Sequence, residues 1–162
     1  MAETLGSLID KLSIKAIREF HIRKMLAAQT GKRSGAALRG KLDIVGKQKR
    51  LILAEVEEFI LSAIRQGTVP RDEKLKLYNK PEAMNKIGRI SSLAKGIDAL
   101  MKKNLELWHL EDEARREDAP LAYIGRIKRK IDAANQQRND LMDRIDELLE
   151  QRLLQNRTNE CG

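Results

Sequence analysis

The chain is poor in aromatic residues and in cysteine. Aromatic side chains make up only 3% of its 162 residues, whereas charged side chains make up 35%. This balance, with abundant Leu, Ile, Ala, Lys, Glu and Arg, is typical of long helices with exposed faces and argues against β structure. The single cysteine, Cys161, excludes a disulfide framework and a thiolate metal site.

The chain also lacks long apolar runs and recognisable catalytic motifs. No uncharged apolar stretch approaches the length of about 18 residues that a transmembrane helix needs. The first residues show no basic segment followed by an apolar one, so we expect no signal peptide and a soluble cytoplasmic protein. Neither a Gly-x-Gly-x-x-Gly segment nor a P-loop is present, and no nucleophile is placed for Ser/His/Asp or Cys/His catalysis. We therefore assign no catalytic residue and predict no cofactor.

What the chain does contain is apolar residues at helical spacing. They predict four helices: over 3–28, from Ser34 to about 66, from Pro81 to a turn near 119, and from Asp118 to about 156. Because turns this short join antiparallel neighbours, we predict an all-α fold of two helical hairpins in a four-helix, bundle-like arrangement. The expected single domain covers 1–162, with repeat 1 at about 3–66, a connector at 67–80, repeat 2 at about 81–156 and a frayed tail at 157–162.

The two predicted hairpins resemble each other in sequence. Five residues of the first helix are identical to those that stand 88 positions later, namely Ile9, Asp10, Leu12, Lys15 and His21 with Ile97, Asp98, Leu100, Lys103 and His109. Four residues of the second helix recur 89 positions later, namely Lys41, Asp43, Gln48 and Glu58 as Lys130, Asp132, Gln137 and Glu147. The only two histidines of the chain match each other, which indicates an internal duplication.

The duplicated polar residues suggest a His–Asp pair in each hairpin. Residues equidistant from a hairpin turn lie at the same level, which places His21 opposite Asp43 and His109 opposite Asp132. A carboxylate that accepts from one imidazole nitrogen leaves the other nitrogen free to bind a ligand or transfer a proton. The alternative is an interhelical hydrogen bond that only sets the register of the hairpin.

A more specific hypothesis is that His109 and nearby glutamates bind a metal ion. Glu106 and His109 have the Glu-x-x-His spacing of di-iron bundles, and Glu113 follows one turn later. Such a fold needs two of these motifs, and Arg18 stands where the first repeat should carry the matching glutamate. We therefore predict no metal.

The last predicted helix carries polar residues beside its apolar seam. Asp132, Asn135 and Asn139 share one face, Arg138 occupies a seam position, and Asn104 of the preceding helix lies level with Arg138. Such residues form either a buried network or a polar groove for an anionic or sugar-like ligand. The candidate polar site comprises His109, Asp112, Asp132, Asn135, Gln136, Arg138 and Asp140, with His21 and Asp43 as the equivalent pair of the first repeat.

A basic stretch at 32–50 is the remaining feature with a binding interpretation. Its cations are Lys32, Arg33, Arg39, Lys41, Lys47, Lys49 and Arg50, and the net charge of the chain is +8. Such a stretch can follow a phosphate backbone, but it contains no aromatic residue for base stacking. Nucleic-acid binding is therefore a third alternative.

Several motifs of the C-terminal half resemble a family of small bacterial proteins of unknown function. They are 108-WHLED-112, 129-RKID-132, 135-NQQRND-140 and 145-ID-146, and 5-LGSLIDKLSIKAIREFH-21 is similar to related sequences. The first repeat departs from the pattern, because Phe20 replaces the tryptophan and Gly46 stands where the second repeat has Asn135. The resemblance implies an all-helical cytosolic protein, loosely associated with gene neighbourhoods for bacterial cell-surface polysaccharide, and no established activity.

We predict a non-catalytic interaction or accessory protein that forms a homo-oligomer, with a dimer as the first expectation, or binds a protein partner. The first alternative is an enzyme or small-ligand binder that uses His109, Asp132, Asn135 and Arg138. The second alternative is the basic nucleic-acid binder described above.

Overall fold

The computed structural model of the chain describes residues 3–28, 32–69 and 87–160, and these residues are almost entirely helical. The helices are α1 (Leu5–Ala28), α2 (Lys32–Gln66), α4 (Leu93–Ala114) and α5 (Leu121–Glu160). Within the described ranges no residue is in a β-strand, and no described helix is long and apolar enough to cross a membrane. The predicted all-α fold is confirmed.

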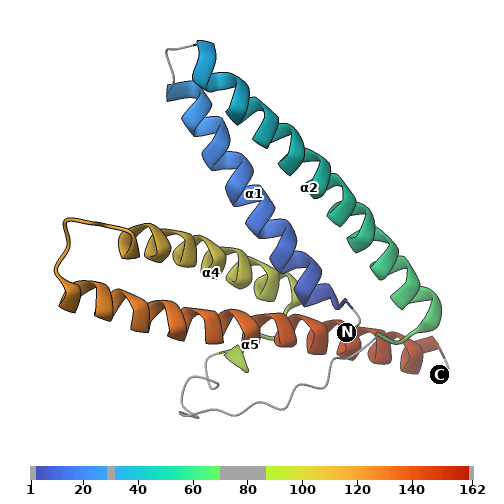
Figure 1. Cartoon of the computed structure of the whole chain (residues 1–162). Helices are drawn as coiled ribbons and strands as arrows, with labels where there is room; N and C mark the ends of the chain where they lie inside the picture. The colour runs from blue at the N-terminus through green and yellow to red at the C-terminus, as the bar shows by residue number, and fades with distance from the viewer. Residues whose placement is uncertain (1–2, 29–31, 70–86, 161–162) are drawn as a thin grey trace.

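The helices form two antiparallel hairpins, α1 with α2 and α4 with α5, as the sequence predicts. Figure 1 shows that the hairpins diverge from the end at which α1 begins and α5 ends. Helix α1 makes the main connection between them, because it packs against α4 and α5 as well as against α2. The far ends of the two hairpins, where each one turns, lie apart in Figure 1.

The main hydrophobic core lies where the hairpins meet. Its buried centre is formed by Leu5 of α1, Leu100 of α4, and Leu141 and Ile145 of α5. The partly buried side chains around this centre come from all four helices and from the segment before α4, namely Ile9, Val56, Phe59, Ile87, Ile90, Leu93, Ile97, Ala99, Met142 and Leu149. A second hydrophobic cluster lies within the α4–α5 hairpin. Its buried residues are Leu107, Ile127, Ile131 and Ala134.

The start of α1 is fixed tightly against α5. Thr4 Oγ1 accepts from the Ser7 backbone N–H at 3.2 Å, which satisfies one free donor of the first turn. The backbone N–H of Gly6 donates to Asp146 Oδ1 at 2.7 Å. A Cβ atom on Gly6 would stand 2.2 Å from the carbonyl oxygen of Met142, so only glycine permits this approach.

The helix ends agree with the sequence prediction in some places and differ in others. Gly67 ends α2 with a positive φ of 64° and donates to the Ala63 carbonyl, as the predicted stop requires. Helix α4 begins at Leu93, whereas the sequence predicts a start at Pro81, which lies outside the described residues together with most of the predicted connector at 67–80. Helix α5 continues to Glu160, past the predicted end near 156.

The late start of α4 has a visible cause in α5. Arg144 donates from Nε and Nη2 to the carbonyl oxygen of Ile90, at 2.9 and 2.8 Å. Ile87 and Ile90 pack on the core from a turn, in which the Ile90 N–H donates to the Ile87 carbonyl. Their apolar spacing was correctly assigned to the core. Ile87 is helical, but residues 88–92 are not, so the single helix predicted from Pro81 is interrupted before Leu93.

Candidate functional site

A buried polar cluster of Asp10, Ser13 and Asn104 joins α1 to α4. Asn104 Nδ2 donates to Asp10 Oδ1 at 2.9 Å and lies 2.6 Å from Ser13 Oγ. Ser13 Oγ in turn donates to the Asp10 carbonyl at 2.9 Å. All three side chains are buried. Asp10 and Ser13 share one face of α1 because they are three residues apart, so one amide of α4 holds both of them.

Arg138 brings α5 to the same cluster. Its Nε lies 3.8 Å from Asp10 Oδ1, which is an ion pair but too long for a hydrogen bond. The Arg138 Nε atom is buried and has no hydrogen-bond partner among the described residues. Since Asp10 already accepts from Asn104, its carboxylate only partly compensates the buried charge of Arg138.

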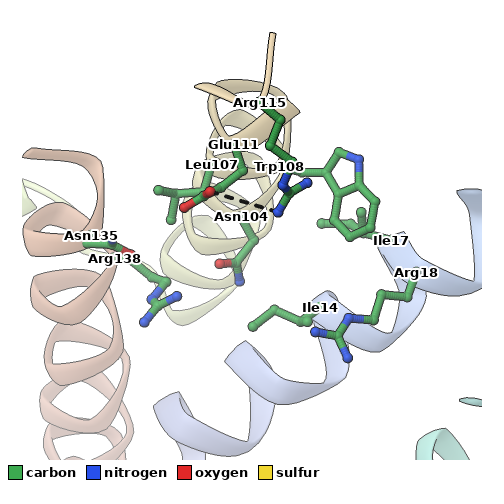
Figure 2. Close-up of a pocket in the computed structure, with 10 residues that line it drawn as sticks. All are labelled: Ile14, Ile17, Arg18, Asn104, Leu107, Trp108, Glu111, Arg115, Asn135 and Arg138. Carbon is green, nitrogen blue, oxygen red and sulfur yellow. Dashed lines mark ion pairs between the residues drawn. The ribbon is translucent and has the colours of Figure 1, made fainter. Parts of the chain in front are cut away.

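A pocket of about 320 Å³ lies beside this polar cluster, between α1 and the α4–α5 hairpin. Figure 2 shows its lining: Ile14, Ile17, Arg18, Asn104, Leu107, Trp108, Glu111, Arg115, Asn135 and Arg138. Three helices contribute to it, because its residues come from α1, α4 and α5. The ligand pocket, as we call this set of residues, is therefore built from both hairpins.

The lining of the ligand pocket has an excess of positive charge. It contains three arginines and one carboxylate, that of Glu111, which lies 3.9 Å from Arg115. Arg115 also contacts Asp112 outside the pocket, at 3.2 Å. In Figure 2 the guanidinium groups of Arg18 and Arg138 stand on opposite sides of Asn104. Arg18 has no ion-pair partner within the part of the chain that the structure describes.

An aromatic contact closes the side of the pocket at which α1 passes α4. The rings of His21 and Trp108 stack with their centroids 4.6 Å apart and their planes at 13°. Phe20 meets the His21 ring edge-on, at 5.4 Å. The His21 Nε2 and Trp108 Nε1 atoms are buried without a hydrogen-bond partner among the described residues. Figure 2 shows the Trp108 ring over Ile17, with its nitrogen directed away from the pocket.

The structure brings two of the predicted site residues into this pocket. Asn135 and Arg138 line it, and Asn104, predicted to lie level with Arg138, lines it as well. Gln136 is exposed and donates to Asp140 Oδ1 at 3.3 Å, while Asp140 itself is buried. Asp112 is exposed and pairs with Arg115.

The structure does not bring together the predicted His–Asp pairs. Asp43 is exposed and forms an ion pair with Lys47 at 2.8 Å, while His21 turns to Trp108. The Lys47 ammonium lowers the pKa of the Asp43 carboxyl. His109 and Asp132 are both exposed, and no hydrogen bond joins them. The turn predicted which residues lie at the same level, but Asp43 pairs with Lys47, His21 stacks on Trp108, and His109 and Asp132 are exposed.

No metal-binding cluster occurs in the ranges that the structure describes, where no three or more His, Cys, Asp or Glu side chains converge. The Glu106 carboxylate of the di-iron-like spacing pairs instead with Lys103. In the basic stretch at 32–50, Lys47 and Lys49 are engaged in ion pairs, with Asp43 and Glu19. The side chains of residues 32–34 lie outside the described part.

Ionisable groups are also coupled at the turn between α4 and α5. The Tyr123 hydroxyl donates to Glu113 Oε2 at 2.8 Å, which lowers the pKa of the Glu113 carboxyl and raises the pKa of the Tyr123 phenol. Arg116 binds Asp118 at 3.0 Å and lowers the pKa of that carboxyl. Each charge already has a partner from the turn, so these shifts mark a structural contact.

Sequence reasoning missed several pocket residues, and a signal for them was present. Trp108, Glu111 and Arg115 follow Asn104 at helical spacing, so they continue one stripe along α4 to its C-cap. Trp108 was used only as part of a family motif, and Glu111 and Arg115 were given no binding role. Arg18 was noticed only because it breaks the metal motif.

No curated protein and no solved structure matches the chain. A family model matches part of it, and this part agrees with the resemblance that the C-terminal motifs suggest. The matched segment contains nearly all of α4 and α5, and with them Asn104, Trp108, Asn135 and Arg138 of the ligand pocket. Residues 94–161 match the family described as a protein of unknown function, DUF4254.

Proposed function

We propose that this protein is a non-catalytic binding protein whose ligand, a small anion, occupies the ligand pocket. The observation that carries the proposal is the unbalanced charge of the lining, three arginines against the single carboxylate of Glu111. Buried charge is costly unless it is paired and hydrogen-bonded. An anion in the pocket would supply the hydrogen-bond partner that Arg138 Nε lacks among the described residues.

Binding is favoured over catalysis by the chemistry of the lining. Of the ten residues, none is a serine, cysteine or histidine, and the one carboxylate lies beside a guanidinium. Such a set can orient an anion but offers no evident nucleophile or general base. The predicted accessory role agrees with this proposal, and the loose association with cell-surface polysaccharide gene neighbourhoods that the sequence resemblance implies stays a prediction.

Thermal unfolding with a panel of small anions tests the proposal. A ligand that binds only the folded protein raises the melting temperature, by mass action. We expect at least one of phosphate, sulfate, citrate and a hexose phosphate to stabilise the wild-type protein but not Arg18→Gln. The matched control is Arg39→Gln, which removes the same charge from an exposed position on α2. The proposal fails if no anion distinguishes the wild type from Arg18→Gln, or if both variants lose the effect equally.

We propose in addition that a second copy of the chain docks on an apolar groove between α1 and α4. The groove, of about 480 Å³, is lined by Ser13, Ala16, Ile17, Phe20, Asp98, Met101, Lys102 and Leu105. Phe20, Met101 and Leu105 are large apolar side chains left exposed, which is typical of interaction sites.

Charge supports a second copy as the occupant of this groove. The chain carries a net charge of +8, so two copies repel each other over most of their surfaces. The lining of the groove holds one acid and one base, Asp98 and Lys102, which pair at 2.7 Å. A two-fold axis would bring Phe20 of each copy to the Asp98 end of the other, a self-complementary contact.

A further inference from the structure

We infer that the anion which the ligand pocket takes is a phosphate monoester. This inference rests on the proposed function and goes further, because it selects one ligand class among small anions. Three features of the pocket support it: its charge, the directions from which its arginines come, and an apolar wall beside them.

The charge of the pocket matches that of a phosphate monoester. Within the lining, Arg18, Arg115 and Arg138 contribute three positive charges and Glu111 one negative charge, an excess of two. Asp112 and Asp10 pair with Arg115 and Arg138 from outside the lining, which leaves Arg18 as the lining arginine without an ion-pair partner among the described residues. A phosphate monoester carries a charge of about −1.5 to −2 near neutral pH. A simple carboxylate carries one negative charge, which is less than the excess within the lining.

The arginines reach the pocket from three different helices. Arg18 comes from α1, Arg115 from the C-cap position directly after α4, and Arg138 from α5. A carboxylate has two oxygens in one plane and is satisfied by one or two guanidinium groups. A phosphate monoester has three terminal oxygens in a tetrahedral arrangement, so it can accept from donors that approach on different sides. Asn104 and Asn135 add amide groups to the same lining.

An apolar wall stands next to these donors. It is formed by Ile14 and Ile17 of α1 and by Leu107 and Trp108 of α4. Free phosphate would leave this wall in contact with water, whereas the carbon part of an ester covers it. The pocket volume, about 320 Å³, lies at the lower end of the range for ligand pockets, roughly 300–1,000 Å³. We therefore expect an ester about the size of a monosaccharide phosphate.

The intrinsic fluorescence of the protein reports on this site directly, because Trp108 is the only tryptophan and lines the pocket. We propose titrations of the full chain with glucose phosphate, glycerol phosphate, inorganic phosphate, sulfate, glucuronate and glucose. The expected result is a saturable change with the two monoesters, at concentrations about tenfold lower than for inorganic phosphate or glucuronate, and no change with glucose. Tenfold corresponds to about 1.4 kcal/mol. Against inorganic phosphate this difference comes from apolar contact of the ester carbons with the wall, and against glucuronate from about one charge-assisted hydrogen bond.

Variants of Arg18 keep the test specific without disturbing the core, since the Arg18 side chain is exposed. Arg18→Gln should weaken monoester binding about tenfold, the loss expected for one charge-assisted hydrogen bond. Arg18→Lys should retain part of the affinity, because it keeps the charge but not the planar donor geometry. Arg39→Gln, with the same net charge as Arg18→Gln, should bind like the wild type.

The outcomes separate the inference from the proposed function. If sulfate or glucuronate binds as tightly as the monoesters in an Arg18-dependent manner, the phosphate assignment is overturned while anion binding stands. If inorganic phosphate binds as tightly as the monoesters, the ester assignment is overturned. If no anion gives an Arg18-dependent signal by fluorescence or by calorimetry, the inference and the proposed function both fail.

Discussion

Asn104 makes both of its donor contacts across the boundary between the two hairpins. Its amide sits on α4, whereas Asp10 and Ser13, which it holds, sit on α1. A buried amide with satisfied partners specifies how two elements pack, because any other register would leave its donors and their acceptors unpaired. The same amide lines the ligand pocket, so one residue connects the packing of the hairpins to the site.

Asn104→Ala should therefore lower the free energy of unfolding by about 2 kcal/mol, because the buried Asp10 carboxylate and the Ser13 hydroxyl lose their shared donor. Urea denaturation followed by circular dichroism measures this change. Asn139→Ala, an amide removed from an exposed position of α5, is the matched control and should change stability by less than about 0.5 kcal/mol. Equal stability of the two variants would show that the polar cluster does not hold the hairpins together.

For single residues, the sequence predicted which residue types belong to the site better than where their side chains point. Arg138 and Asn135 stood out as polar residues on or beside an apolar seam, and both line the pocket. His109 stood out because histidine is rare in the chain, yet it is exposed. Rarity cannot say where a side chain points. His21 found a ring to stack on only because α1 crosses α4 at Trp108, a tertiary contact that no spacing within one helix contains.

At the scale of elements, apolar spacing predicted most of the helices because each one buries a single stripe. The seam of α5 shows this most clearly, since its members are all buried: Ile127, Ile131, Ala134, Leu141, Ile145 and Leu148. The start of α4 was not predictable in the same way. Ile87 and Ile90 have helical spacing, but a turn and a contact from Arg144 place them on the core. A pattern of burial therefore identifies core residues more reliably than helix ends.

Two glycines in different surroundings predict opposite effects of the same substitution. Gly6→Ala should destabilise the fold by about 1–3 kcal/mol, because the new Cβ would meet the Met142 carbonyl and push α1 away from α5. At Gly125 of α5 nothing lies within 4 Å of an added Cβ, so Gly125→Ala should stabilise the helix by about 1 kcal/mol. Thermal and urea unfolding of both variants compare the two effects. A neutral Gly6→Ala would contradict the close approach of α1 to α5.

The Tyr123–Glu113 contact links α4 to α5 and predicts a pH dependence with two limits. The pKa of Glu113 lies below its ordinary value of 4.5, so its contribution is present above that value and is lost as pH falls through the lowered pKa. The pKa of Tyr123 lies above its ordinary value of 10.0, so its contribution is present below that value and is lost as pH rises through the raised pKa. The contact is therefore complete across the neutral range.

Ultraviolet titration of the phenol measures the alkaline limit. The chain has two tyrosines, so the experiment uses a Tyr78→Phe background in which only Tyr123 ionises. We expect a midpoint above the ordinary value of 10.0, because the Glu113 carboxylate favours the protonated phenol. Glu113→Gln should bring the midpoint back down, since the neutral amide removes that charge. An unchanged midpoint in Glu113→Gln would show that the hydrogen bond does not persist in solution.

At the scale of the whole molecule, the two repeats are alike in sequence, but their equivalent residues make different contacts. Asp10 is buried against Asn104, whereas its counterpart Asp98 is exposed and pairs with Lys102. The counterpart of Trp108 in the first repeat is Phe20, which remains exposed beside the apolar groove. The sequence similarity of the repeats thus predicted two hairpins but not which residues each position contacts, because equivalent residues of the two hairpins face different neighbours. The groove that contains the exposed Phe20 is the one on which we propose a second copy.

Analytical ultracentrifugation over a range of protein concentrations tests this dimer. The wild-type protein should sediment as a dimer that dissociates on dilution, and Leu105→Glu should remain monomeric, because it places a charge inside the apolar groove of each copy. Leu121→Glu is the control, since Leu121 is 89% exposed and lies outside the groove. It introduces the same change in charge and should leave the dimer intact. The proposal is contradicted if the wild-type protein stays monomeric at all concentrations. It is also contradicted if Leu121→Glu dissociates as readily as Leu105→Glu.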